Sequence, residues 1–131
     1  MGRRNQLAMI DIDLRRIQRL QKAMKHAPAL IAEELGKAVR DLVLLVEGVA
    51  KKNCPVDTGK LRASITPVIE SWSAGYVGTN TAYAPYVEYG TRKMPAQPFL
   101  EPAFLEGKKQ ADKIFGDAIA RAIARYEKEA S

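Results

Sequence analysis

The chain has 131 residues, 47% hydrophobic and 27% charged, which is enough for one domain with a buried core and excludes a disordered polar chain. It contains no apolar run near the ~20 residues of a membrane span and only one cysteine, Cys54, so an internal disulfide is excluded. Its first residues are not expected to act as a secretory signal, because no uninterrupted apolar stretch follows the basic ones. The formal net charge is +6, and residues 1–27 carry most of it, with seven basic residues against two acidic ones.

The basic segment 1–27 is predicted to be helical and to precede an α+β body at 28–131, the two forming a single domain. Apolar residues follow one helical stripe, and Asp13 is placed to cap its start. The stripe consists of Leu14, Ile17, Leu20 and Met24. The positive charge indicates either an acidic partner surface, protein or nucleic acid, or a solvated helix face. The candidate interface residues here are Arg3, Arg4, Arg15, Arg16 and Arg19.

A long helix is predicted from Pro28, which suits a first helical turn, to Cys54, where Pro55 should stop it. Its apolar residues recur every three or four positions, and Leu42 is expected at the centre of the core. A second long helix is predicted near the C-terminus, with Pro102 in its first turn. Its apolar stripe consists of Phe104, Ala111, Phe115, Ala118, Ala122 and Tyr126, with Ile114, Ile119 and Ile123 alongside.

Between these helices the spacing changes at a corner that begins at Pro55. Asp57, Thr58 and Gly59 are turn formers: Asp57 is expected to accept a backbone N–H, and Gly59 to need a positive φ. After the corner, alternating apolar residues predict strands at 61–69 and 76–79. The corner is interpreted as architectural, with a contact surface as the alternative.

Aromatic residues mark two more stretches. Trp72 lies near the predicted hairpin tip, where it would either pack on its own sheet or contact a partner. Segment 83–94 is rich in tyrosine, and Gly90 is expected to end a short extended or helical piece within it. The candidate interface residues from these stretches are Trp72, Tyr83, Tyr86, Tyr89, Arg92 and Met94.

Catalytic groups are scarce. His26 is the only histidine, so no metal site is predicted, and Cys54 is expected to be a partly buried, inert thiol. Asp57 and Glu88 could form a carboxylate pair, but a turn-capping aspartate and a surface glutamate are the preferred interpretation. No catalytic residue and no cofactor is predicted.

Two stretches together resemble a known family. The first contains Pro55-Val56-Asp57-Thr58-Gly59, and the second contains Tyr86-Val87-Glu88-Tyr89-Gly90-Thr91 followed by Pro98-Phe99-Leu100. The pattern resembles the gene-product-ten-like minor structural proteins of lambdoid, long-tailed bacteriophages and prophages. The matching positions are Pro55, Asp57, Thr58, Gly59, Leu61, Arg62, Ser64, Tyr83, Tyr86, Glu88, Gly90, Thr91, Pro98, Phe99 and Pro102.

The sequence departs from the family at Glu101, where a basic residue is common, and at Tyr89, where Phe is common. The resemblance implies an α+β fold with a small antiparallel sheet packed by long N-terminal and C-terminal helices. It also implies a non-enzymatic virion protein, made in the host bacterial cytoplasm, that forms a ring at the head–tail junction. The implied partners are a head-closure or connector protein, a tail terminator or tail tube protein, and DNA in the channel, with no membrane. The alternative function is a nucleic-acid-binding accessory protein.

Overall fold

The computed structural model describes residue 15, residues 17–56 and residues 59–131. Residues 17–26 form a helix, called here the N-terminal helix. The elements that follow are α2 (Pro28–Asn53), α3 (Lys60–Ser64), β1 (Thr66–Ser71), β2 (Ala74–Gly78), α4 (Ala84–Tyr89) and α5 (Leu100–Ala130). The predicted α+β class, with a small antiparallel sheet flanked by long helices, is confirmed.

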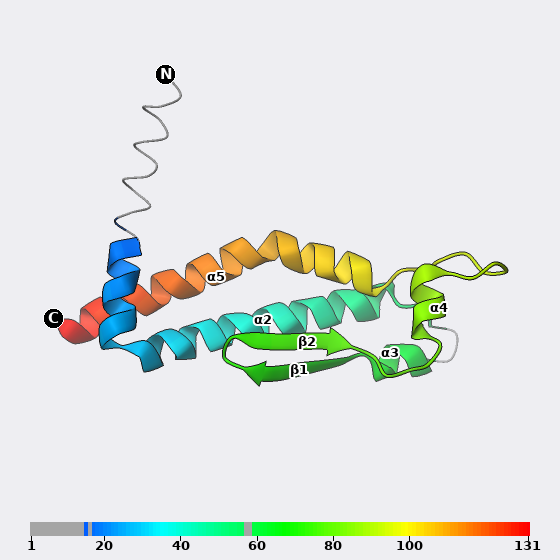
Figure 1. Ribbon diagram of the computed structural model, residues 1–131, viewed down its shortest axis with the longest axis horizontal. Coiled ribbons are helices and arrows are strands. Elements are labelled where there is room, and N and C mark those ends of the chain that lie inside the picture. Colours follow the sequence, from blue (N-terminus) through cyan, green and yellow to red (C-terminus); the bar gives the residue numbers. More distant parts are fainter. Residues whose placement is uncertain (1–14, 16, 57–58) are drawn as a thin grey trace, which may run out of the picture.

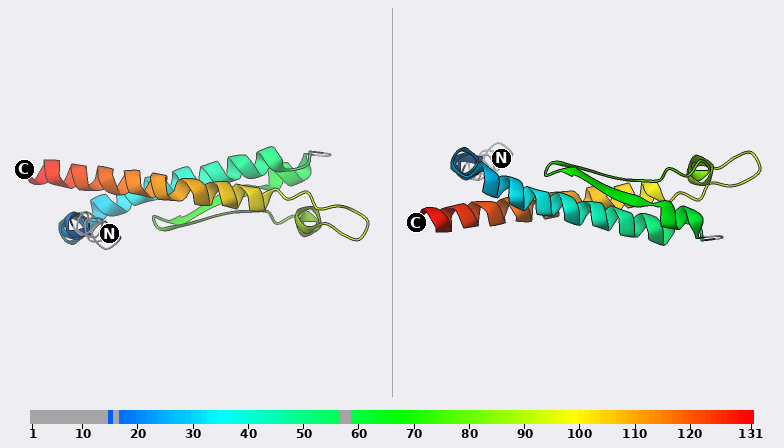
Figure 2. Two further views of the ribbon diagram at one scale, coloured as in Figure 1. Left: turned by 90° about the horizontal axis from the view of Figure 1, so that it is seen from above. Right: turned by 90° about the horizontal axis from the view of Figure 1, so that it is seen from below.

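Helices α2 and α5 run antiparallel, side by side, along the length of the molecule (Figure 1). The β1–β2 hairpin lies along α2, so α2 packs against both the sheet and α5 (Figure 2). The N-terminal helix crosses the pair near the end of α5, whereas α3 and α4 lie at the opposite end (Figure 1). The end with the N-terminal helix is called the far end, and the end with α3 and α4 is called the sheet end.

Helix α2 begins at Pro28 and ends at Asn53, just before Pro55, as predicted. Its buried centre is Val39, Val43 and Val46, whereas Leu42 is only partly buried. The prediction that Leu42 is central to the core is therefore wrong. Leu42 lines an open groove on the protein surface instead.

Helix α5 has Pro102 in its first turn, and its predicted stripe is confirmed at Ala118 and Ala122, which are buried, but not at Phe104. Phe104 is half exposed, and the buried positions of α5 are all small except Ile123: Ala103, Gly107, Ala118, Ala122 and Ile123. A Cβ at Gly107 would lie 2.7 Å from Val46 Cγ2. Because the two helices approach this closely, small residues occupy the contact, and Phe104 turns outward.

The corner leads into a helix, not a strand. Gly59 has φ 71° and caps α3, so the predicted positive φ is confirmed. Leu61 and Ile65 are buried and Ala63 is exposed, which fits a spacing of four and contradicts a spacing of two. Strand β1 begins only at Thr66. Asp57 and Thr58, including the predicted backbone bond to Asp57, lie outside the described residues.

The hairpin pairs Thr66 with Gly78 and Val68 with Tyr76, in antiparallel register. Gly75 faces α2, because a Cβ there would lie 2.5 Å from Val43 Cγ2. Its neighbour Tyr76 therefore points outward, together with its cross-strand partner Val68. Each strand of this two-stranded sheet has a free edge, so Pro67 lies in an edge strand as predicted.

The N-terminal segment is helical as predicted over its described part, and its predicted apolar stripe is confirmed at Leu20 but wrong at Ile17 and Met24. Ala23 is fully buried, Leu20 is partly buried, and Ile17 and Met24 are about half exposed. Asp13 and Leu14 lie outside the described residues. The His26 ring stacks on Tyr126 of α5 at a centroid distance of 6.2 Å.

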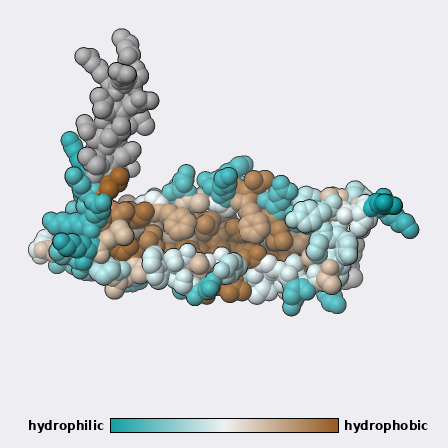
Figure 3. Space-filling model, viewed as in Figure 1, coloured by the Kyte–Doolittle hydropathy of each residue, from teal (hydrophilic) through white to brown (hydrophobic). Residues whose placement is uncertain are grey.

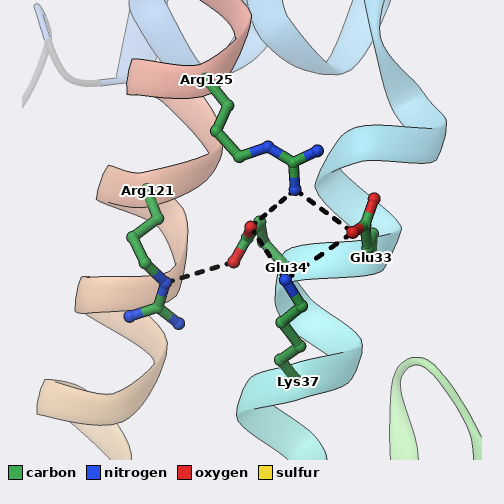
Figure 4. A network of polar contacts seen from close by, with 5 residues as sticks. All are labelled: Glu33, Glu34, Lys37, Arg121 and Arg125. Atoms are coloured by element: carbon green, nitrogen blue, oxygen red, sulfur yellow. Dashed lines mark hydrogen bonds and ion pairs between the residues drawn. The ribbon is translucent and has the colours of Figure 1, made fainter.

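Next to that helix, a polar network ties α2 to α5 (Figure 4). The Glu34 carboxylate is buried, and it accepts bonds from Arg125 Nη1 at 2.7 Å and Arg121 Nε at 3.2 Å. Lys37 and Glu33 complete the network from the α2 side. The hydrogen bond from Arg125, the largest influence, lowers the pKa of Glu34.

Candidate interaction surface

Most of the described motif positions gather at the sheet end, but they divide between the core and the surface. Phe99 is completely buried, and Leu61 is 5% exposed. Arg62, Thr91 and Pro98 are exposed, and Pro55 and Pro102 are partly buried. The Ser64 hydroxyl donates to the Leu61 carbonyl at 2.6 Å and also bonds the Thr79 hydroxyl. Ser64 thereby ties α3 to the segment that follows β2.

Glu88 is the most constrained residue of the motif. It lies on α4, is 7% exposed, and accepts three backbone N–H bonds from the start of α5. The Phe99 and Leu100 amides donate to Oε1 at 3.0 and 2.9 Å, and the Glu101 amide donates to Oε2 at 3.0 Å. The carboxylate thus satisfies amides that a helix N-terminus otherwise leaves unpaired, and its charge complements the helix dipole.

This arrangement corrects the expectation that Glu88 is a surface residue. Both of its oxygens are engaged by the backbone, so the carboxylate acts as a helix cap supplied by another helix. Its proposed catalytic partner, Asp57, lies outside the described residues. The sequence carried one signal that was missed: a glutamate eleven residues before Phe99, followed by Pro98 and a long helical pattern.

Gly90 ends α4 with φ 79°, and a Cβ there would lie 2.7 Å from the Ala96 amide nitrogen. The predicted end of a helical piece at Gly90 is confirmed. Beyond it, Thr91 forms a tight loop with Met94: the Thr91 amide donates to the Met94 carbonyl at 2.8 Å. The Thr91 hydroxyl accepts the Met94 amide at 3.1 Å. The loop therefore has a fixed shape that presents Arg92 and Met94 outward.

The aromatic interface candidates are on the surface. Tyr89 is 80% exposed, Tyr86 57% and Trp72 52%, while Tyr83 is 38% exposed. Trp72 also lies against α2, since its Cβ is 3.5 Å from the position that a Cβ on Gly36 would take. These side chains are available for contacts, and their interface role stays a prediction.

The basic candidates divide in a different way. Arg3, Arg4 and Arg16 lie outside the described residues, whereas Arg15 and Arg19 are exposed. Arg19 donates to the Glu127 carboxylate of α5, and this hydrogen bond raises the pKa of Arg19 and lowers that of Glu127. Arg19 is thus partly committed to holding the N-terminal helix against its own chain.

The structure adds apolar surface that sequence reasoning missed. A groove between α5 and the hairpin, floored by α2, is lined by Leu42, Val43, Val46, Gly75, Tyr76, Val77 and Phe104. It lies within the brown strip that runs between α5 and the hairpin in Figure 3. The signal was the spacing of small residues in α5, which places Ala103 and Gly107 inward and Phe104 and Leu105 outward.

Other site chemistry is limited within the described ranges. Cys54 is buried, as expected of an inert thiol, and burial raises its pKa. No group of three or more histidine, cysteine, aspartate or glutamate residues in the described part of the chain could hold a metal ion. None of the helices described is long and apolar enough to cross a membrane.

The chain matches the model of the family described as "Bacteriophage HK97-gp10, putative tail-component" over residues 17–90. Since this match covers more than half of the chain, the protein belongs to the HK97-gp10-like family and is a structural tail component of a bacteriophage virion. The matched region includes the Gly59 corner, the hairpin and Glu88. Searches of curated proteins and of solved structures returned no match.

Proposed function

We propose that this protein is a non-enzymatic neck subunit that joins the phage head to the tail. It folds as one domain and forms a ring of identical subunits. Its neighbours are the head-closure or connector protein on one side and a tail terminator or tail tube protein on the other. After synthesis in the bacterial cytoplasm, it resides at the head–tail junction of the virion.

The observation that carries this proposal is that the Tyr83–Thr91 stretch uses its carboxylate to stabilise the fold and exposes its tyrosines. Its one carboxylate, Glu88, is not available for catalysis, because both of its oxygens accept backbone amides at the start of α5. Its tyrosines point outward, and tyrosine is enriched at protein interfaces. The stretch thus supports contact with other proteins better than it supports a reaction.

A deletion of the gene in the phage that carries it tests the proposal. We expect filled heads and complete tails that do not join, and restoration of joined particles when purified protein is added to the lysate. The protein should also be found in wild-type particles, at the junction, by antibody labelling. Joined, infectious particles from the deletion mutant would refute the neck assignment.

The basic N-terminal segment supports a second candidate, a nucleic-acid-binding accessory protein. Arg15, Arg19, Lys22 and Lys25 are all exposed, and residues 17–26 contain no acidic side chain. A gel-shift titration across salt separates the two functions. A dedicated binder should lose about 0.9 log unit of affinity per log unit of salt for each phosphate neutralised. Weak binding at low salt only, with normal head–tail joining activity, favours the neck protein.

A further inference from the structure

An apolar band crosses the sheet end of the molecule. It joins the outer face of the hairpin to α2, α5 and α4, and it consists of Val68, Tyr76, Leu42, Phe104, Leu105 and Tyr89. Its grooves share residues, since Tyr76 lines one groove with Val68 and another with Phe104, and Phe104 lines a third with Tyr89 and Leu105. The band is therefore one continuous surface.

The band exposes a large apolar area to solvent. Tyr76, Phe104 and Tyr89 are 58%, 51% and 80% exposed. At about 200 Å² for each aromatic side chain, these three leave roughly 380 Å² in water. Val68 and Leu105 add to this at 51% and 54% exposure. A soluble monomer rarely exposes an apolar patch beyond a few hundred Å², and a standard interface covers about 800 Å² per partner.

A second exposed apolar surface lies at the far end. On the N-terminal helix, Ile17 and Met24 are 48% and 52% exposed, and their spacing of seven residues places them on one face. In Figure 1 this helix stands at the opposite end of the α2–α5 pair from α4. It therefore does not cover the band of its own chain, so this helix face and the band can contact each other only between two molecules.

Charge favours the same pairing. The N-terminal helix presents Arg15, Lys22 and Lys25, and residues 17–26 contain no acidic side chain. Three acidic residues of α5 also face this helix: Glu127 near Lys22, and Asp112 and Asp117 in the groove that Ile17 lines. The band is flanked by Glu70, which accepts the Tyr76 hydroxyl, and by Glu101 and Lys108. Two of these three flanking residues are acidic, which complements the cationic side chains of the N-terminal helix, and such complementarity orients two partners.

We propose that the apolar band of one subunit binds the N-terminal helix of a second copy of this chain, with Ile17 and Met24 against Phe104 and Leu105. The inference rests on the proposed ring, because a contact between two different surfaces is heterologous and can continue around a closed circle. An amphipathic helix laid in an apolar groove is a common recognition mode.

Cysteine cross-linking in assembled particles tests this contact. Phage are grown with the wild-type chain, Ile17→Cys, Leu105→Cys, or both changes, and purified particles are treated with a short bismaleimide. Cys54 is 3% exposed and stays in every variant as a constant background. We expect dimers and longer ladders from the double variant, and monomers from wild type and from each single variant.

The outcomes separate the two proposals. Dimers from Leu105→Cys alone would show band-to-band contact and overturn the inference, as would only monomers from particles that contain the double variant. Wild-type particles that lack the chain would instead refute the neck function itself.

A second pair of variants decides the matter even where cysteine variants fail to assemble. Phe104→Asp is compared with Leu44→Asp, since Leu44 is 49% exposed on α2 and is not among the residues that line these grooves. Both isolated proteins should melt like wild type. Phe104→Asp should lower the copies per particle by about tenfold or more, and Leu44→Asp should not. Normal incorporation of Phe104→Asp would overturn the inference.

Discussion

Two carboxylates are buried in the described part of the chain, one toward each end of the α2–α5 pair, and they are satisfied in different ways. At the sheet end, Glu88 accepts three backbone amides from the start of α5. At the far end, Glu34 accepts the side chains of Arg121, Arg125 and Lys37. The first set of donors is fixed by the backbone, whereas the second belongs to flexible, partly exposed cations.

This difference predicts how much stability each end loses when its buried carboxylate is removed. Loss of the Glu88 carboxylate leaves three backbone amides at the start of α5 without their acceptor. These amides cannot turn to water as side chains can, because they are fixed by the helix backbone beside the buried Phe99. Loss of the Glu34 carboxylate frees Arg121 and Arg125, whose side chains are 50% and 38% exposed and can turn to water. The sheet end should therefore depend on a single residue far more than the far end does.

The largest effect is expected from Glu88→Ala. Three amides, one buried and two partly buried, lose a charged acceptor, so the free energy of unfolding should fall by about 3 kcal/mol or more. Urea denaturation measures the loss. Glu88→Gln keeps one acceptor oxygen and should lose about half as much.

Glu101→Gln is the matched control for Glu88, because it removes an exposed charge at the same helix start. It should cost no more than about 1 kcal/mol through the helix dipole alone. Equal losses for Glu101→Gln and Glu88→Ala would show that charge, rather than the three hydrogen bonds, stabilises this end.

Close packing gives the next effect. In Gly107→Ala the new Cβ would lie 2.7 Å from Val46 Cγ2, so the α2–α5 contact must widen, at a cost of about 1–3 kcal/mol. In Gly116→Ala the new Cβ would meet no atom within 4 Å. Alanine lowers the entropy of the unfolded chain, so this variant should be more stable than wild type by about 0.5–1 kcal/mol. Opposite shifts in melting temperature are expected, and a stabilised Gly107→Ala would mean that the sheet end is packed no more tightly than the rest of α5.

The same comparison explains how much of the fold was predictable from sequence. Local signals were sufficient for both long helices: Pro28 and Pro102 lie in their first turns, and α2 ends just before Pro55. Local turn chemistry also predicted the positive φ of Gly59 and the end of α4 at Gly90.

Predictions failed where a distant segment decides the outcome. Phe104 and Leu42 were assigned to the core, but α2 and α5 approach each other closely at Gly107, so these two large side chains lie nearer the surface. Leu61 and Ile65 fit both a strand and a helix, and only the exposure of Ala63 separates the two. Neither buried glutamate was predicted, because the amides that bind Glu88 and the arginines that bind Glu34 lie eleven or more residues away in sequence.

A smaller effect is expected at the corner of the sheet end. Gly59 has φ 71° and open space where a Cβ would lie, so Gly59→Val should destabilise by backbone strain alone, by about 1–2 kcal/mol. Gly59→Asn tolerates this φ and should cost less. If Gly59→Val melts like wild type while head–tail joining is lost, the corner is a contact surface rather than an architectural turn.

The smallest effect, and the one most dependent on pH, is expected from Glu34→Gln at the far end. At neutral pH the variant should lose about 1 kcal/mol at most, because its cationic partners are partly exposed. The pKa of Glu34 is lowered in the folded protein, so its contribution is present above the ordinary glutamate pKa and is lost as pH falls through the lowered value. The free energies of unfolding of wild type and Glu34→Gln should therefore differ at pH 7, converge in acid, and differ less in high salt, where the exposed guanidinium groups are screened.

Urea titrations at pH 7 and pH 3, each at low and high salt, measure these free energies. Glu88→Gln is the comparison, and its loss of stability should change little with salt. A gap between wild type and Glu34→Gln that persists unchanged at pH 3 would show that Glu34 stabilises the far end through packing and not through its charge.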